Sequence, residues 1–373
     1  FENLFGYNWE QSTSPAGAVQ WVPSEGAGAE KVPDAHESTK YHSPIMFTTD
    51  LALKFDPAYE KIARRFHSKP EEFADAFGKA WYKLTHRDMG PYCRGLGSLV
   101  PLEPQLWQDP IPPLNHKVID RENIDSLKEI IWGLELSVGE LVKTAWASAS
   151  TFRGTDKRGG ANGGRLRLSP QSNWAVNEPK KLNVVLQAYE KIQSDFNNSR
   201  SDGMRVSMAD LIVLGGCVAI EKAAELGGSE LKVEFRPGRM DASSEWTDEE
   251  SFEVLEPKSD GFRNYVGSNN SRSPADLLLE RANFLNLSAN EMTILIGGLR
   301  TLGAVFDDND IGVLTENPGT LSNDFFVNLL DIDISWEKSH EDENIFEGRD
   351  NSQGSIKWRA SSIDLLFGSN SQL

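Results

Sequence analysis

The sequence is poor in cysteine, in basic residues and in long apolar runs, and each shortage excludes a class of protein. Only Cys93 and Cys217 occur among the 373 residues, so neither a disulfide framework nor a cysteine-based metal site is available. We expect both to be reduced, buried thiols. The 38 basic against 56 acidic residues give a formal net charge of −18, which on average repels a phosphate backbone. A nucleic-acid partner is therefore not expected.

Long apolar runs are also missing. No stretch reaches the roughly 18 consecutive apolar residues that cross a bilayer, and the opening residues 1–5 lack the basic segment typical of a signal peptide. We therefore expect no membrane association and a reducing, cytoplasmic location. Because the chain opens in a hydrophobic segment without Met, we also expect a fragment that is cut at both ends.

Helical patterns are abundant and predict a mainly α protein. Asp56 precedes Pro57, which is the pattern of an N-cap before a proline at the first helical position. Ser137-x-x-Glu140 and Ser288-x-x-Glu291 have the capping-box spacing directly ahead of apolar runs. Further helices are expected over residues 70–81, 123–134, 182–196, 207–224, 249–255 and 274–284.

Strand patterns are few. Residues 231–235 alternate between apolar and polar side chains, which predicts a strand, and residues 332–336 are expected to pair with residues 355–358 as a short hairpin.

Five prolines between residues 101 and 114 indicate an extended linker, since proline cannot continue a helix. We therefore expect two domains, residues 1–115 and residues 116–373. The content of 39% hydrophobic residues is enough to fill two cores.

A repeat joins the two ends of the chain. Phe1-x-Asn3-Leu4 followed by Trp9-Glu10-x-Ser12 returns as Phe326-x-Asn328-Leu329 followed by Trp336-Glu337-x-Ser339. Residues 47–53 also align with residues 367–373, and this alignment matches Asp50 with Asn370. We interpret this as a duplicated domain, with chance similarity of two helical tails as the alternative.

No self-contained active site is visible in the sequence. The six histidines show no paired metal-ligand spacing. The glycine-rich run at residues 159–164 has basic neighbours that favour an anion, but it fits neither phosphate-binding fingerprint, so we expect a structural turn.

Longer motifs carry a family resemblance. Residues 48–53, followed by Asp56-Pro57, resemble the proximal aspartate segment of intracellular haem peroxidases, and residues 82–91 resemble catalase-peroxidases specifically. Residues 141–147, 152–165, 214–217, 237–242 and 322–326 are similar to the second domain of that family. The resemblance covers essentially the whole chain.

This resemblance implies a haem-peroxidase-like helical fold in duplicated domains, with haem b only in the first. The haem-ligating His, the distal Arg-Trp-His, the proximal Trp and the Met-Tyr-Trp adduct would all precede Phe1. In the second domain the distal pattern Arg-x-Ala-Trp-His is replaced by Lys143-Thr144-Ala145-Trp146-Ala147. At the proximal side, Gly297-Gly298 is followed by Leu299 and Arg300, and Asn370 stands for the aspartate. The second domain is therefore expected to bind no haem in the family manner.

Two matched residues carry chemistry by resemblance. Asp50 is expected to accept hydrogen bonds from the haem-ligating His and the proximal Trp, which orients the imidazole and makes it more basic. Without the family, Asp50 would be a helix N-cap. Arg87 matches the family's mobile arginine, which pairs with the adduct tyrosinate and controls the catalase half-reaction. Without the family, it would be an ordinary ion-pair residue at a helix end.

The resemblance implies an oxidoreductase that decomposes hydrogen peroxide and oxidises small donors. Its expected partners are hydrogen peroxide, the remainder of the N-terminal haem domain and a second copy in a homodimer. The alternative is a non-catalytic scaffold that supports the haem domain and the dimer and is inactive as an isolated chain.

Overall fold

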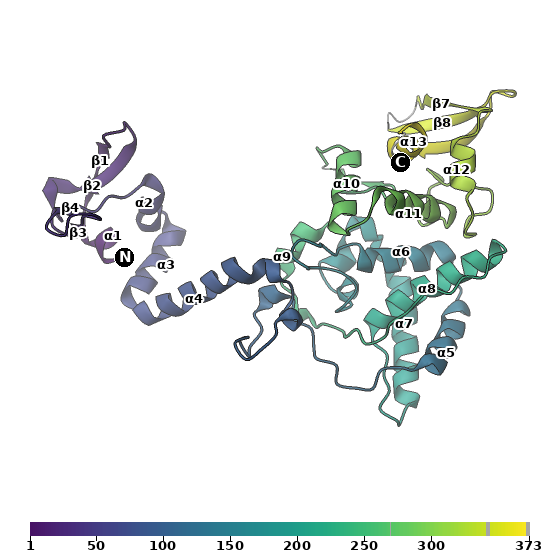
Figure 1. Ribbon diagram of the computed structural model, residues 1–373, viewed down its shortest axis with the longest axis horizontal. Coiled ribbons are helices and arrows are strands. Elements are labelled where there is room, and N and C mark those ends of the chain that lie inside the picture. The colour runs from purple at the N-terminus through teal and green to yellow at the C-terminus, as the bar shows by residue number, and fades with distance from the viewer. Residues whose placement is uncertain (269, 341–343, 371–373) are drawn as a thin grey trace. The chain divides into compact units, whose positions relative to one another are not determined.

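The computed structural model describes residues 1–268, 270–340 and 344–370 and divides into two compact units, Phe1–His86 and Arg87–Leu373. Helices dominate both units, which confirms the mainly α class (Figure 1). The compact units divide before the prolines, so residues 87–115 pack with the second unit. The boundary expected near residue 115 concerns the duplicated domains and stays a prediction.

The first unit, Phe1–His86, combines two small hairpins with helices. Its helices are α1 (Glu2–Gly6), α2 (Thr48–Phe55), α3 (Pro57–Ser68) and α4 (Pro70–His86), and its strands are β1 (Trp9–Thr13), β2 (Val19–Pro23), β3 (Val32–Pro33) and β4 (Tyr41–His42). Strand β1 pairs with β2 and β3 with β4, both antiparallel. The predicted start of α3 is confirmed, because the carboxylate of Asp56 accepts the backbone N–H groups of Ala58 and Tyr59.

The first unit buries little apolar surface. Leu4, Leu51 and Ala63 are at most 5% exposed, whereas Phe77 and Trp81 on α4 are each 57% exposed. Aromatic rings therefore remain on the surface of this unit.

The second unit, Arg87–Leu373, contains the remaining helices and strands. Its helices are α5 (Arg121–Trp132), α6 (Val138–Ala149), α7 (Pro179–Ser199), α8 (Met208–Leu226), α9 (Glu249–Phe252), α10 (Pro274–Phe284), α11 (Ala289–Thr301), α12 (Asp324–Leu329) and α13 (Ser362–Ser369). Its strands are β5 (Ser259–Asp260), β6 (Tyr265–Val266), β7 (Ile334–Lys338), β8 (Ile345–Asp350) and β9 (Ile356–Ser361).

Helix α8 lies at the centre of the second unit. It is buried along most of its length, and a Cβ added at Gly216 would lie 2.5 Å from the Cβ of Ala145 on α6. Glycine at this position therefore allows the two helices to approach closely. The large hydrophobic core of the unit forms around them, with contributions from α5, α7, α10 and α11.

The capping predictions are confirmed. The Ser137 and Ser288 hydroxyls accept the backbone N–H groups of Glu140 and Glu291, and each glutamate accepts the N–H of its serine in return. Both boxes start helices at the expected residues, α6 and α11, because this signal depends only on four consecutive residues.

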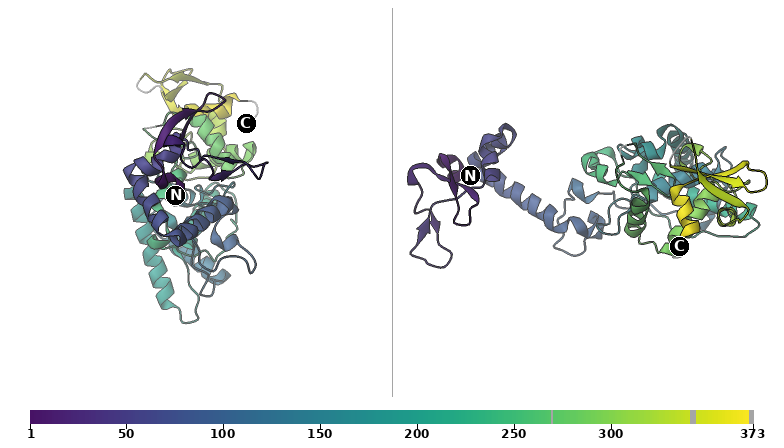
Figure 2. Two further views of the ribbon diagram at one scale, coloured as in Figure 1. Left: turned by 90° about the vertical axis from the view of Figure 1, so that its left-hand side faces the viewer. Right: turned by 90° about the horizontal axis from the view of Figure 1, so that it is seen from above.

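Three expectations are wrong. Residues 231–235 form no strand, because no neighbouring strand offers a ladder there, and the Val233 N–H bonds the Glu221 carboxylate instead. The expected hairpin of residues 332–336 with 355–358 is a three-stranded sheet in which β8 lies between β7 and β9. Its strands belong to the yellow, C-terminal end of the ribbon (Figure 2). Cys93 is exposed, and only Cys217 is buried, where burial raises the pKa of its thiol.

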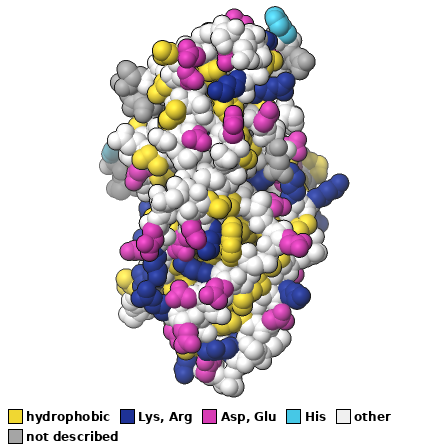
Figure 3. Space-filling model, turned by 90° about the vertical axis from the view of Figure 1, so that its right-hand side faces the viewer, with side chains coloured by type: hydrophobic (Ala, Val, Ile, Leu, Met, Phe, Trp, Pro, Cys, Tyr) yellow, Lys and Arg dark blue, Asp and Glu magenta, His cyan; other side chains and the backbone are white. Residues whose placement is uncertain are grey.

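The surface carries charges of both signs. Figure 3 shows acidic and basic side chains interspersed on one face, with hydrophobic side chains in a hollow between them. Among the described residues, no helix has the length and apolar character needed to cross a membrane. In the same part of the chain, no group of three or more His, Cys, Asp or Glu side chains is placed to hold a metal ion.

Candidate functional site

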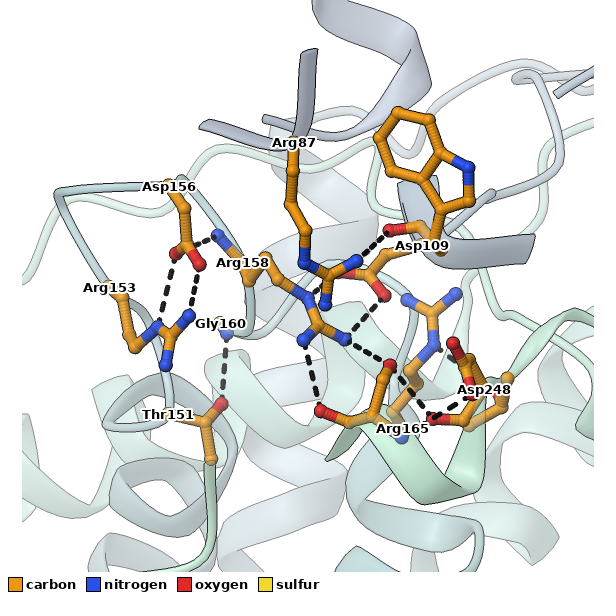
Figure 4. Close-up of polar contacts among 12 residues, drawn as sticks. Arg87, Asp109, Thr151, Arg153, Asp156, Arg158, Gly160, Arg165 and Asp248 are labelled. Atoms are coloured by element: carbon orange, nitrogen blue, oxygen red, sulfur yellow. Dashed lines mark hydrogen bonds and ion pairs between the residues drawn. The ribbon is translucent and has the colours of Figure 1, made fainter. Parts of the chain in front are cut away.

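Arg87 opens the second unit in the short 3₁₀ helix Arg87–Met89. Its side chain is half-buried and its Nη1 donates to the carbonyl oxygen of Trp107 at 3.4 Å. That distance is long for a hydrogen bond, so the guanidinium is held only weakly. The contact lies among a group of arginines and carboxylates (Figure 4).

The charges around Arg87 are of both signs. Partial burial lowers the pKa of the Arg87 guanidinium, and the neighbouring Arg158 cation is the second cause. The carboxylates of Asp109, Asp156 and Asp248 act in the opposite direction. Arginine has an ordinary pKa far above neutrality, so Arg87 remains a cation.

The segment that accepts from Arg87 is a short turn with one capping contact of its own. A 3₁₀ helix spans Leu106–Gln108, and the Gln108 side chain accepts the backbone N–H of Gln105 at 2.8 Å. Asp109 ends this helix in the left-handed region, with φ 49°. Asp and Asn tolerate that conformation better than most residues, which explains an aspartate at this position.

Asp109 and Arg158 form a buried, two-pronged ion pair. Arg158 Nε lies 2.8 Å from Asp109 Oδ2, and Arg158 Nη2 lies 3.1 Å from Oδ1. The two side chains are only 7% and 2% exposed. The remaining Arg158 donors bond the carbonyl and hydroxyl oxygens of Ser251 at 3.0 and 2.9 Å. Charged groups at this depth need such complete pairing.

A second buried arginine holds the next residue of the linker. Arg165 Nη2 donates to the carbonyl of Pro110 at 2.8 Å and to the carbonyl of Trp246 at 3.1 Å. The guanidinium groups of Arg165 and Arg158 both lie over the ring of Phe252, at 5.5 and 5.1 Å from its centroid. The proline linker is thus tied to the body of the second unit at Asp109 and Pro110.

The glycine-rich run forms the turn that brings Arg158 and Arg165 to the linker. A Cβ at Gly159 would lie 2.2 Å from the carbonyl oxygen of Thr151, and φ there is +73°, so only glycine fits. The Gly160 N–H bonds the Thr151 hydroxyl at 2.9 Å. These contacts support the interpretation of the run as a structural turn.

Asp50 lies in the first unit, at the third residue of α2. Its Oδ2 accepts the backbone N–H of Phe47 at 2.7 Å, so the N-cap residue is Phe47 and Asp50 closes the first turn from inside the helix. The carboxylate also suits the positive end of the helix dipole. The role that the family resemblance implies for Asp50 is separate from this local one and stays a prediction.

The second unit contains a counterpart of this helix, and it corrects the alignment with Asn370. Helix α13 also has eight residues, and its third residue is Asp364, whose Oδ2 accepts the backbone N–H of Ser361 at 2.8 Å. Asn370 is the C-cap of α13, as Asp56 is of α2. By its position in the helix, Asp364 rather than Asn370 is therefore the counterpart of Asp50. The Asp-Leu pair that both helices share was the sequence signal for it.

Asp364 holds Arg300, which stands in the segment where the proximal His is expected. Arg300 Nε lies 2.8 Å from Asp364 Oδ1, and both side chains are 0% exposed. Arg300 Nη1 and Nη2 donate to the carbonyls of Phe262 and Gly261 at 2.6 and 2.8 Å. In the second unit, the carboxylate thus orients a guanidinium instead of an imidazole.

Residues 259–264, which supply the carbonyls that Arg300 binds, also contact α6, the helix with the altered distal pattern. Trp146 on α6 donates from Nε1 to Asp260 Oδ2 at 3.0 Å, and its ring centroid lies 4.5 Å from that of Phe262. Phe262 is 0% exposed, and Asp260 is paired with Arg263 at 2.7 Å. Residues 259–264 thus fill the space between α6 and α11.

These residues do not fit haem. The Arg300 guanidinium bonds Asp364, Phe262 and Gly261, none of which carries an imidazole, and Phe262 with its flanking backbone occupies the space between Trp146 and Arg300. Lys143, at the distal arginine position, forms an ion pair with Glu178, with Nζ 2.9 Å from Oε2 and both side chains nearly buried. Iron needs an axial donor with a lone pair, which a guanidinium cannot offer.

Comparison with known proteins finds similarity along the whole chain. The profile of the family described as Peroxidase matches residues 79–373. Identity is 59% to the "Catalase-peroxidase" of Polaromonas sp., 58% to the "Catalase-peroxidase" of Hahella chejuensis and 56% to "Catalase-peroxidase 2" of Legionella pneumophila, each over 100% of this chain. The chain spans about half the length of these relatives, 50–51%.

Proposed function

Because this chain belongs to the peroxidase family, we propose that the protein of which it forms part is a haem-dependent catalase-peroxidase. Such a protein decomposes hydrogen peroxide to water and oxygen, or uses peroxide to oxidise a small donor. The observation that carries the proposal is the identity of 56–59% along the whole chain to relatives named catalase-peroxidase. Haem b supplies the redox chemistry when bound, and the family resemblance assigns its ligands to residues outside this chain.

Asp50 is proposed to orient the haem-ligating imidazole. Its Oδ2 is engaged by the Phe47 N–H, which fixes the carboxylate on α2 and leaves Oδ1 for a second donor. The counterpart Asp364 supports this division, because its Oδ2 accepts the Ser361 N–H while its Oδ1 accepts from Arg300. A carboxylate that accepts the N–H of a ligating imidazole fixes its tautomer and raises its basicity.

Arg87 is proposed to act as the switch of the catalase half-reaction. Its long contact to the Trp107 carbonyl is weak, which suits a side chain that moves between two positions. In the full-length haem protein, we expect Arg87→Ala to lower catalase turnover at least tenfold while peroxidase turnover stays within about threefold, a difference of about 1.4 kcal/mol or more in the catalase barrier.

Oxygen release and oxidation of a chromogenic donor measure the two activities of the Arg87→Ala protein. Arg94→Ala, an exposed arginine of the adjoining turn, is the matched control and should change neither activity. Equal loss of both activities in Arg87→Ala would contradict the switch role.

A second candidate function applies to the second unit, which we propose to be a non-catalytic scaffold. The buried Phe262 and the Arg300–Asp364 pair favour it, since they fill the region between α6 and α11 with side chains and backbone. In this role the unit holds the proline linker, and with it Arg87, through buried arginines.

Titration of haemin into this chain tests the scaffold role. We expect no stoichiometric binding and no histidine-ligated absorption spectrum. Arg300→His is the matching variant, and it should also fail to bind, because Phe262 still fills the space. A one-to-one histidine-ligated spectrum with peroxidase turnover in the unaltered chain would overturn the scaffold role.

We also propose that the full-length protein works as a homodimer in the cytoplasm, with the rest of the haem domain packed on the first unit. The family resemblance supports the dimer and the location. The exposed aromatic rings of α4, Phe77 and Trp81, support a packing partner for the first unit.

A further inference from the structure

We propose that Asp109 is a positioning residue for Arg87, acting through the backbone of the linker that Arg158 and Arg165 hold. This inference rests on the proposed switch role of Arg87 and adds a part of the second unit to it. Within the part of the chain that the structure describes, Asp109 is not hydrogen-bonded to Arg87; it acts on the carbonyl two residues earlier and on the charge of Arg158.

The first step is mechanical. The acceptor of Arg87 is the Trp107 carbonyl, which belongs to the one-turn helix that ends at Asp109. A single 3₁₀ turn has little stability of its own. Its position is fixed from outside, by the Asp109 carboxylate on Arg158 and by the Pro110 carbonyl on Arg165. Loss of the first anchor therefore leaves the acceptor of Arg87 less well defined.

The second step is electrostatic. Arg158 is a cation only 2% exposed, and Asp109 is its carboxylate partner at 2.8 Å. With the charge of Asp109 removed, the full field of Arg158 acts on the neighbouring Arg87 guanidinium and repels it, and low exposure weakens the screening by water. The observed position of Arg87 thus depends on a neutralised Arg158.

The two steps have the same consequence for Arg87. Its observed position at the Trp107 carbonyl is weakly bonded, so small changes in free energy shift its population between that position and others. Since a switch that controls the catalase half-reaction must return to a defined position, loss of Asp109 should slow that half-reaction and leave peroxidase turnover alone.

The decisive experiment is a double-mutant cycle in the full-length haem protein. Asp109→Asn keeps a side chain that tolerates the left-handed backbone and removes only the charge. We expect catalase turnover to fall at least fivefold and peroxidase turnover to change less than twofold. In the Arg87→Ala background, Asp109→Asn should lower catalase turnover by less than a further twofold, because the residue on which it acts is gone.

A matched control separates this from general destabilisation. Asp364→Asn removes the charge from another buried Asp–Arg pair of the same unit, and the partners of Asp364, namely Arg300, Asn264 and Ser361, lie outside the linker. Its effects on catalase and peroxidase should be equal to one another and the same in both Arg87 backgrounds. Should Asp109→Asn fail to fold, Arg158→Lys keeps the charge but loses the two-pronged geometry and should give the same selective loss.

The outcomes distinguish the two proposals. An unaltered full-length protein without catalase activity, or an Arg87→Ala variant with full activity, would overturn the proposed function of the protein or of Arg87. An active protein in which Asp109→Asn has no selective effect on catalase, or lowers it equally in both Arg87 backgrounds, would overturn the positioning role alone.

Discussion

Helices α2 and α13 have the same length and the same carboxylate at their third residue, yet that carboxylate faces different surroundings. Asp50 in α2 lies in a unit that buries few apolar side chains, and its carboxylate accepts the Phe47 backbone N–H. Asp364 in α13 is fully buried and also binds Arg300 and Asn264. The same position in two similar helices thus carries a half-buried carboxylate in the first unit and a fully buried ion pair in the second.

The ion pairs of the two units differ in the same way. In the first unit, Glu60–Arg64 and Asp75–Lys79 lie on exposed helix faces, where such pairs add about 0.3 to 0.5 kcal/mol each. In the second unit, Arg300–Asp364 and Arg158–Asp109 are buried and bidentate or multiply bonded. Breaking a buried pair leaves an uncompensated charge. Substitution of Asp364 should therefore cost much more stability than substitution of Asp50.

The largest expected effect belongs to Asp364→Asn in this chain. It leaves the Arg300 guanidinium buried without a countercharge, so we expect the second unit to lose about 3 to 5 kcal/mol of stability. Urea unfolding followed by near-ultraviolet circular dichroism measures the loss. The double variant Arg300→Met with Asp364→Leu, which removes both charges, should recover much of it. A loss below about 1 kcal/mol in Asp364→Asn would show that the Arg300–Asp364 pair does not stabilise the second unit as a buried ion pair.

The elements predicted correctly are those with local signals. Ser137 and Ser288 each begin a four-residue capping box that predicts the start of a helix. Asp56 followed by Pro57 is likewise a local helix-start signal. Strand β8 was missed because Glu347 and Arg349 interrupt its apolar pattern, although both lie in a paired strand. The strand expected at residues 231–235 has a strand-like pattern but no partner, and a strand needs its neighbour to exist.

The candidate site was predictable only in part. Asp50 and Arg87 were identified by resemblance to a family, and their catalytic roles stay predictions. The Asp109–Arg158 pair joins residues 49 positions apart, and no spacing rule connects them. Asn370 was aligned with Asp50 because phenylalanines were matched, whereas the helix starts show that Asp364 is the counterpart. The positions of the helix starts, given by the capping contacts, identified Asp364 as the counterpart of Asp50, which matching of phenylalanines had not.

The smallest expected effect on stability belongs to Asp50→Asn in this chain. The asparagine carbonyl can still accept the Phe47 N–H, and the side chain is only half-buried, so the loss should not exceed about 1 kcal/mol. The same urea experiment, followed at a wavelength that reports on the first unit, compares it directly with Asp364→Asn. A loss as large as that of Asp364→Asn would erase the difference between the two helices.

In the full-length haem protein, the same Asp50→Asn substitution should act on chemistry rather than on stability. If Oδ1 holds the ligating imidazole, a neutral amide there weakens the hydrogen bond and lowers the basicity of the ligand. We therefore expect lower catalase turnover and an altered iron coordination in the absorption spectrum, at nearly unchanged unfolding midpoint. Unchanged spectra and rates would show that α2 carries only the helix-closing role that its geometry already displays, and that the two aspartates differ in burial alone.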